Sequence, residues 1–133
     1  MPEKILVVDD DPDIFEALTM ILECQGYQVI WARDGIEGLA CLKAEKPDLL
    51  ILDLLMPKID GFAVLKELQE PRWAEFADIP ILILTSVREE ASRRRYKLET
   101  GLELGADDYV EKPILPDAIL KKVEKLIKRK QEV

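Results

Sequence analysis

Short apolar runs alternate along the chain with longer segments in which apolar residues recur at helical spacing. The short runs predict five β-strands separated by turn residues such as Pro47 and Pro80. The first, third and fourth runs are almost wholly apolar, as strands buried on both faces should be, so we expect them in the middle of a sheet. The predicted strands are Lys4–Val8, Tyr27–Trp31, Leu49–Leu52, Ile81–Leu84 and Asp108–Val110.

The segments between the strands predict amphipathic helices. Capping chemistry marks three helix starts, because Asp11 precedes Pro12, Asp34 stands three residues before Glu37, and Asp60 precedes a glycine. Strands that alternate with helices predict repeated βα units around a parallel sheet, an α/β fold. The apolar positions of the helices are Phe15, Leu18, Ile21 and Leu22, then Ile36, Leu39 and Leu42, then Val64, Leu65 and Leu68, and finally Ile119, Leu120, Val123, Leu126 and Ile127.

Composition narrows the classes of protein that the chain can belong to. A length of 133 residues with 48% hydrophobic content predicts one domain over residues 1–133. The net charge of -8 argues against direct nucleic-acid binding and against anionic membranes. The chain has no histidine, and Cys24 and Cys41 lack metal-ligand spacing, so the sequence argues against a zinc site, a disulfide framework and a histidine-based triad. No apolar stretch approaches the roughly 18 residues of a membrane span, and the expected compartment is the cytoplasm.

Polar residues follow the predicted strands at the edge where ligands bind in open α/β sheets. Asp9 and Asp10 follow the first strand, Asp53 the third, Thr85 the fourth and Lys112 the fifth. Crowded carboxylates repel one another, and a hard cation such as Mg²⁺, which phosphate oxygens also bind, relieves the repulsion. A carboxylate can attack phosphorus, while a hydroxyl and an ammonium neutralise the phosphoryl oxygens. Asp53, Thr85 and Lys112 suit these three roles.

Four segments together resemble the receiver domain of two-component response regulators. They are Ile5-Leu6-Val7-Val8-Asp9-Asp10-Asp11, Leu52-Asp53-Leu54-Leu55-Met56-Pro57-Lys58-Ile59-Asp60-Gly61, Ile83-Leu84-Thr85-Ser86 and Gly105-Ala106-Asp107-Asp108-Tyr109-Val110-Glu111-Lys112-Pro113, which occur in the family's order over essentially the whole chain. The resemblance implies a flavodoxin-like (βα)5 doubly wound parallel sheet with strand order 2-1-3-4-5. It also implies a cis bond before Pro113.

The resemblance further implies a role for each residue of the site. Asp53 would accept a phosphoryl group from a sensor histidine kinase or a phosphotransfer protein. Asp10, Asp53 and the backbone carbonyl of Leu55 would bind Mg²⁺, and Asp9 would act mainly through water bound to the metal. Lys112 would pair with the phosphoryl group. Thr85 and Tyr109 would be the switch residues; for Tyr109 the structural alternative is simple packing in a strand.

The expected function is therefore a phosphorylation-controlled switch and not an enzyme that turns over an external substrate. Its partners would be the kinase and either a separate downstream protein or an attached output domain. Whether the domain forms a homodimer on phosphorylation is left open by the sequence. The segment from Ser86 to Leu104 is longer than in typical receivers, and its basic residues Arg93, Arg94, Arg95 and Lys97 suit either a solvated helix face or partner docking.

Three other classes of protein share part of this pattern. A phosphatase of the haloacid dehalogenase type would need an acid where Leu55 stands. A flavodoxin-like redox module would need a phosphate loop after the first strand, where acids stand instead. A phosphorylation-independent pseudo-receiver, acting as a protein–protein interaction module, is the main alternative, although pseudo-receivers usually lack one of the acid or lysine positions that are present here.

Overall fold

A central parallel sheet organises the protein in this computed structural model, which describes residues 2–54, 56, 60–86, 103 and 105–131. The sheet holds five strands in the order β2-β1-β3-β4-β5, and every neighbouring pair is parallel. The predicted fold class and strand order are therefore confirmed. The strands are β1 Lys4–Val8, β2 Gln28–Ala32, β3 Leu49–Asp53, β4 Ile81–Ser86 and β5 Asp108–Lys112.

Four of the predicted strand ranges were wrong at their ends. β2 lies one residue later than predicted, because the N–H of Tyr27 donates to the carbonyl of Leu22 at the end of the first helix, 3.2 Å away. β3, β4 and β5 continue beyond their apolar runs as far as Asp53, Ser86 and Lys112. The ladder partners explain the longer strands, because Ser86 is in register with Lys112 although both side chains are polar. Backbone pairing thus extends the strands into the residues of the site.

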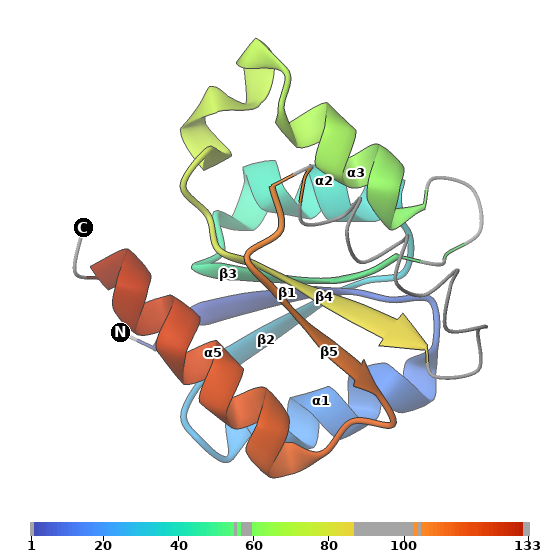
Figure 1. Cartoon of the computed structure of the whole chain (residues 1–133), viewed down its shortest axis with the longest axis vertical. Coiled ribbons are helices and arrows are strands. Elements are labelled where there is room, and N and C mark those ends of the chain that lie inside the picture. The colour runs from blue at the N-terminus through green and yellow to red at the C-terminus, as the bar shows by residue number, and fades with distance from the viewer. Residues whose placement is uncertain (1, 55, 57–59, 87–102, 104, 132–133) are drawn as a thin grey trace.

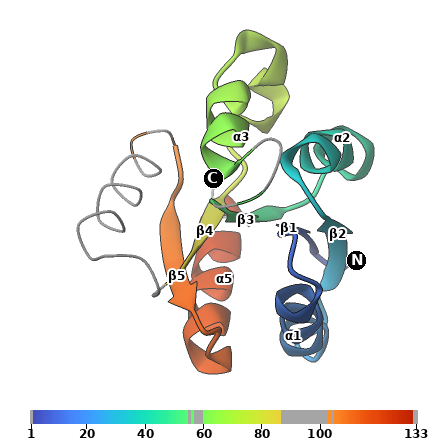
Figure 2. The ribbon, with the colours of Figure 1, turned by 90° about the vertical axis from the view of Figure 1, so that its right-hand side faces the viewer.

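Helices cover both faces of the sheet, α2 and α3 on one face and α1 and α5 on the other (Figure 1; Figure 2). The core accordingly forms two clusters. One contains Leu6, Val8, Leu50 and Leu52 against α2 and α3, and the other contains the alternate strand positions against α1 and α5. The helices are α1 Pro12–Glu23, α2 Gly35–Glu45, α3 Gly61–Leu68 and α5 Pro116–Gln131. No described helix is long and apolar enough to cross a membrane.

The predicted caps are confirmed at all three helix starts. Asp11 accepts from the N–H of Asp13, Asp34 from that of Glu37, and Asp60 from that of Ala63, each at 2.9 Å. These caps satisfy N–H groups that have no partner within the helix.

The short 3-10 helix η1, Pro71–Phe76, was not predicted. Pro71 occupies its first turn, and Trp73 and Phe76 are buried beneath it. The indole of Trp73 donates to Glu67 Oε1 of α3 at 2.8 Å. Two apolar residues three positions apart are too weak a period to predict a helix from sequence, and packing against α3 is what stabilises η1 here.

Candidate functional site

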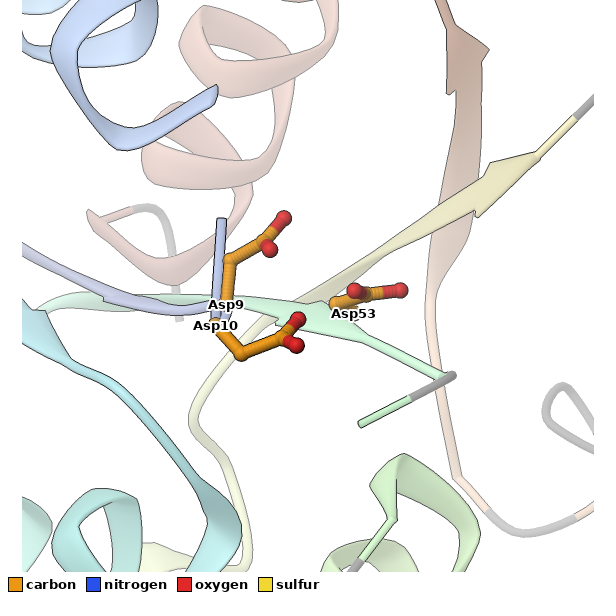
Figure 3. Close-up of side chains that lie close together, drawn as sticks. All are labelled: Asp9, Asp10 and Asp53. Atoms are coloured by element: carbon orange, nitrogen blue, oxygen red, sulfur yellow. The ribbon is translucent and has the colours of Figure 1, made fainter. Parts of the chain in front are cut away.

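An acidic cluster lies beyond the carboxyl ends of β1 and β3, as the sequence predicted (Figure 3). Asp9 and Asp10 follow β1, and Asp53 is the last residue of β3. One carboxylate oxygen from each of the three side chains lies within 4.8 Å of the other two. Asp9 is fully buried, Asp53 is 5% exposed, and Asp10 is exposed to solvent. The cluster therefore has a closed inner side and an open outer side.

Two contacts hold the carboxylate of Asp9, but they do not fully offset the cost of burying its charge. Its Oδ1 accepts a hydrogen bond from the N–H of Asp11 at 2.9 Å. Its Oδ2 lies 3.3 Å from Lys112 Nζ, close enough for an ion pair, but makes no hydrogen bond of good geometry with the described residues. Burial raises the pKa of the Asp9 carboxyl, and the Asp11 N–H and the charge of Lys112 only partly oppose this effect. A second cation beside Oδ2 would relieve the remaining cost of burial.

Lys112 joins the cluster from the end of β5. Its Nζ lies 3.4 Å from Asp53 Oδ2 as well as 3.3 Å from Asp9 Oδ2, and its side chain is 22% exposed. Burial by itself would lower the pKa of Lys112, but the negative charges of Asp53 and Asp9 outweigh it and raise this pKa. The ammonium group is therefore held charged next to the most buried acids. The Lys112–Pro113 bond is cis, as expected.

The backbone of α3 approaches the end of β3 closely. A Cβ atom at Gly61 would lie 2.5 Å from the carbonyl oxygen of Asp53 and 2.7 Å from the Cα of Leu54. Glycine alone fits this contact, and its N–H donates to the carbonyl of Leu54 at 3.1 Å. The start of α3 is thereby fixed against the strand that carries Asp53.

Thr85 and Tyr109, the two predicted switch residues, lie on the neighbouring strands. Thr85 is buried near the end of β4, one position beyond Leu84, which pairs with Asp53 in the sheet. Tyr109, in β5, is half-buried and packs against the core cluster beneath α2 and α3. Its ring lies 4.7 Å from Nζ of Lys122 on α5. Thr85 thus lies near the carboxyl end of the strand next to β3, and Tyr109, in register with Ile83, lies two positions further from that end of the sheet.

Other residues named from the sequence lie outside the described part of the chain. They are Leu55, the predicted carbonyl ligand, and the basic residues Arg93, Arg94, Arg95 and Lys97.

Sequence reasoning did not predict the two ion pairs of Lys112, and it also missed a contact made by a tryptophan. Nε1 of Trp31, in β2, donates a hydrogen bond to the backbone carbonyl of Asp9 at 2.8 Å. A tryptophan at the end of an edge strand was the available signal, but nothing in the pattern of apolar positions says which backbone atom its indole reaches.

A buried acid at a strand end, with two further acids and a lysine beside it, forms the candidate site, and comparisons with known proteins show the class of protein that carries it. Residues 5–124 match the family model of the response regulator receiver domain, so the chain belongs to this family. The chain is 43% identical over 131 residues to the alkaline phosphatase synthesis transcriptional regulatory protein PhoP of Bacillus subtilis, a match that covers 98% of this chain and 51% of PhoP. It spans about half the length of the curated relatives that it matches.

Solved structures of receivers show the same fold. The chemotaxis protein CheY4 of Vibrio cholerae superimposes with a TM-score of 0.80 at 31% identity, covering 95% of this chain and 99% of that one. A CheY-like response regulator receiver domain protein from Methanospirillum hungatei superimposes with a TM-score of 0.85 at 26% identity, covering 99% and 98%. The sequence resemblance to receivers is therefore confirmed.

Proposed function

We propose that Asp53 is the phosphorylation site of this receiver and accepts a phosphoryl group from a sensor histidine kinase or a phosphotransfer protein. The observation that carries this proposal is the position of Asp53, at the end of a buried strand with Lys112 Nζ 3.4 Å from its carboxylate and two further acids beside it. A carboxylate oxygen of Asp53 attacks phosphorus, the bond from phosphorus to the donor nitrogen breaks, and an aspartyl phosphate forms.

The acidic cluster fits a magnesium ion. Asp10 and Asp53 would hold it directly, with the carbonyl of Leu55 as a further ligand and Asp9 in support. The donor set consists of oxygens, as Mg²⁺ prefers, and the Oδ2 of buried Asp9, which has an ion pair with Lys112 but no hydrogen bond with the described residues, supports the fit. When bound, the ion supplies positive charge that offsets the carboxylates and the incoming phosphoryl oxygens.

The remaining residues stabilise and transmit the modified state. Lys112, already charged and aimed at Asp53, pairs with a phosphoryl oxygen. The hydroxyl of Thr85 donates to another phosphoryl oxygen, and the ring of Tyr109 turns inward behind it. The result is a change of the surface beside β4 and β5 that a partner recognises.

The partners are a kinase or phosphotransfer protein on the input side and a protein target or an attached output domain on the output side. The name of the similar PhoP, a transcriptional regulatory protein, supports an attached output domain. A cytoplasmic location and a homodimer formed on phosphorylation stay predictions. Light scattering before and after phosphorylation tests the homodimer.

Intact-mass spectrometry tests the phosphorylation site. After incubation with Mg²⁺ and a small acyl phosphate, the wild type should gain one phosphoryl group, and Asp53→Asn should gain none. Asp34→Asn is the matched control, because Asp34 caps α2 away from the cluster and asparagine caps equally well. A wild type that stays unmodified while Mg²⁺ binds would favour the pseudo-receiver alternative.

A further inference from the structure

The side chain of Trp31 donates a hydrogen bond to the acidic loop, Asp9–Asp11, which follows β1. It is half-buried near the end of β2, in register with Val7 of β1. Its indole Nε1 donates to the backbone carbonyl oxygen of Asp9 at 2.8 Å. A tryptophan has one hydrogen-bond donor, and here that donor is used on the first residue of the acidic cluster.

This contact completes the anchoring of the Asp9 backbone. The N–H of Asp9 donates to the carbonyl of Ala32 at 3.1 Å, which continues the β1–β2 ladder by one step. The carbonyl of Asp9 belongs to the same planar peptide unit as the N–H and Cα of Asp10. A donor that fixes this carbonyl therefore fixes the plane from which the exposed Asp10 side chain extends toward Asp53.

Trp31 is itself held in place by neighbouring side chains. The ring of Phe15, on α1, stacks on it with a centroid distance of 4.6 Å and an interplanar angle of 9°. The guanidinium of Arg33 lies 5.8 Å from the centroid of the same ring. Such stacked and cation–π contacts restrain the indole plane and so the direction of its N–H. The donor is thus preorganised before any ligand binds.

The acidic loop needs such a restraint. Asp9, Asp10 and Asp53 bring like charges within 4.8 Å of one another, and their repulsion favours any movement that carries Asp10 away. A loop that relaxes in the free protein must be drawn back when a cation binds, which weakens the apparent affinity. A fixed Asp9–Asp10 peptide avoids this cost.

We propose that Trp31 is a positioning residue for the divalent cation. Its indole holds the Asp9–Asp10 peptide in the orientation that metal binding needs. This inference rests on the proposed Mg²⁺ site at Asp10 and Asp53. Trp31 touches neither the metal nor the phosphoryl group, and it acts through the backbone of Asp9.

Calorimetric titration with Mg²⁺ compares Trp31→Phe with the wild type. Phenylalanine keeps a ring for Phe15 to stack on and removes the N–H donor. Loss of one hydrogen bond to the loop should weaken Mg²⁺ binding about fivefold. Trp73→Phe is the matched control, since it removes the chain's other indole donor, which is bonded to Glu67 away from the cluster, and it should leave the affinity unchanged.

Equal Mg²⁺ affinities of Trp31→Phe and the wild type, within about twofold, overturn the inference, and so does an equal weakening in Trp73→Phe. A wild type that binds no Mg²⁺ contradicts the proposed function, whereas a wild type that binds it with the same affinity as Trp31→Phe contradicts only the role of Trp31.

A second measurement does not depend on how Trp31→Phe folds. In ¹⁵N-labelled wild type the two indole N–H resonances are assigned with Trp73→Phe, whose one remaining indole is Trp31. The resonance of Trp31 should move in step with Mg²⁺ occupancy, while that of Trp73 stays in place. A Trp31 resonance that does not respond to saturating Mg²⁺ overturns the inference.

Discussion

The three carboxylates of the acidic cluster are held close together although their like charges repel one another. Unit charges within 4.8 Å repel by about 1 kcal/mol or more at effective dielectric constants up to that of water. Lys112 offsets part of this repulsion for Asp9 and Asp53, to which its Nζ lies within 3.4 Å. Asp10 is exposed and lies on the open side of the cluster. Asp10 is therefore the acid whose charge is easiest to remove without harm to packing.

We expect Asp10→Asn to stabilise the metal-free protein by about 1 kcal/mol, because it removes one like charge and keeps the shape of the side chain. Urea unfolding in the presence of a chelator measures this change. A variant that is less stable than the wild type would mean that Asp10 has a structural role in the loop.

The same variant should lose its response to Mg²⁺. A ligand that binds only the folded state at ten times its Kd stabilises that state by about 1.4 kcal/mol, and this gain should nearly vanish in Asp10→Asn. Thermal midpoints with and without Mg²⁺ at matched ionic strength provide the test. Asp11→Asn is the control: it removes the adjacent charge but retains the cap on α1, so its midpoint should still rise with Mg²⁺. A full Mg²⁺ response in Asp10→Asn would place the cation elsewhere.

The sequence predicted which residue types gather at the site because parallel strands place their carboxyl ends at one edge. It did not predict the two contacts of Lys112 or the bond from Trp31 to Asp9. These contacts depend on side-chain direction and on the register between strands far apart in the chain, which periodicity does not report.

At the scale of elements, prediction succeeded where burial determines the pattern. β1 was predicted with the correct ends, because the apolar Ile5–Val8 run meets polar residues at both sides. β5 was predicted too short, because Glu111 and Lys112 belong to the ladder by virtue of backbone pairing with β4. Polar strand ends are where the site lies, so the least predictable positions of the sheet are also its functional ones.

The contact between α3 and β3 supports a prediction at this scale. Gly61→Ala should destabilise the fold by about 1–3 kcal/mol, since its Cβ would lie 2.5 Å from the carbonyl oxygen of Asp53 and backbone must move. Gly38→Ala should cost less, because its Cβ would meet the side chain of Val8, at 2.9 Å, and not backbone. Urea unfolding compares the two variants. Equal costs would mean that α3 can shift freely relative to the strand.

At the scale of the whole molecule, the negative net charge of the chain is opposite in sign to the charge of the basic residues exposed on α5. The exposed residues of α5 include a basic set, Lys121, Lys125, Lys128 and Arg129. The complete chain nevertheless carries -8, with 27 acidic and 19 basic side chains. Binding to a nucleic-acid backbone depends on the local release of counterions and on the long-range field of the protein, and the second of these is repulsive here.

We therefore expect this chain by itself to bind duplex DNA no more tightly than about 100 µM at physiological salt, the weak end of non-specific binding. Fluorescence anisotropy of a labelled duplex measures it, and the phosphorylated chain should behave alike because the added phosphoryl group makes the net charge more negative. Saturable micromolar binding with a steep dependence on salt would show that the basic face of α5 outweighs the net charge, and substitution of Lys125 and Lys128 by glutamate should then abolish it. Absence of binding tighter than about 100 µM in both states is the result that we expect.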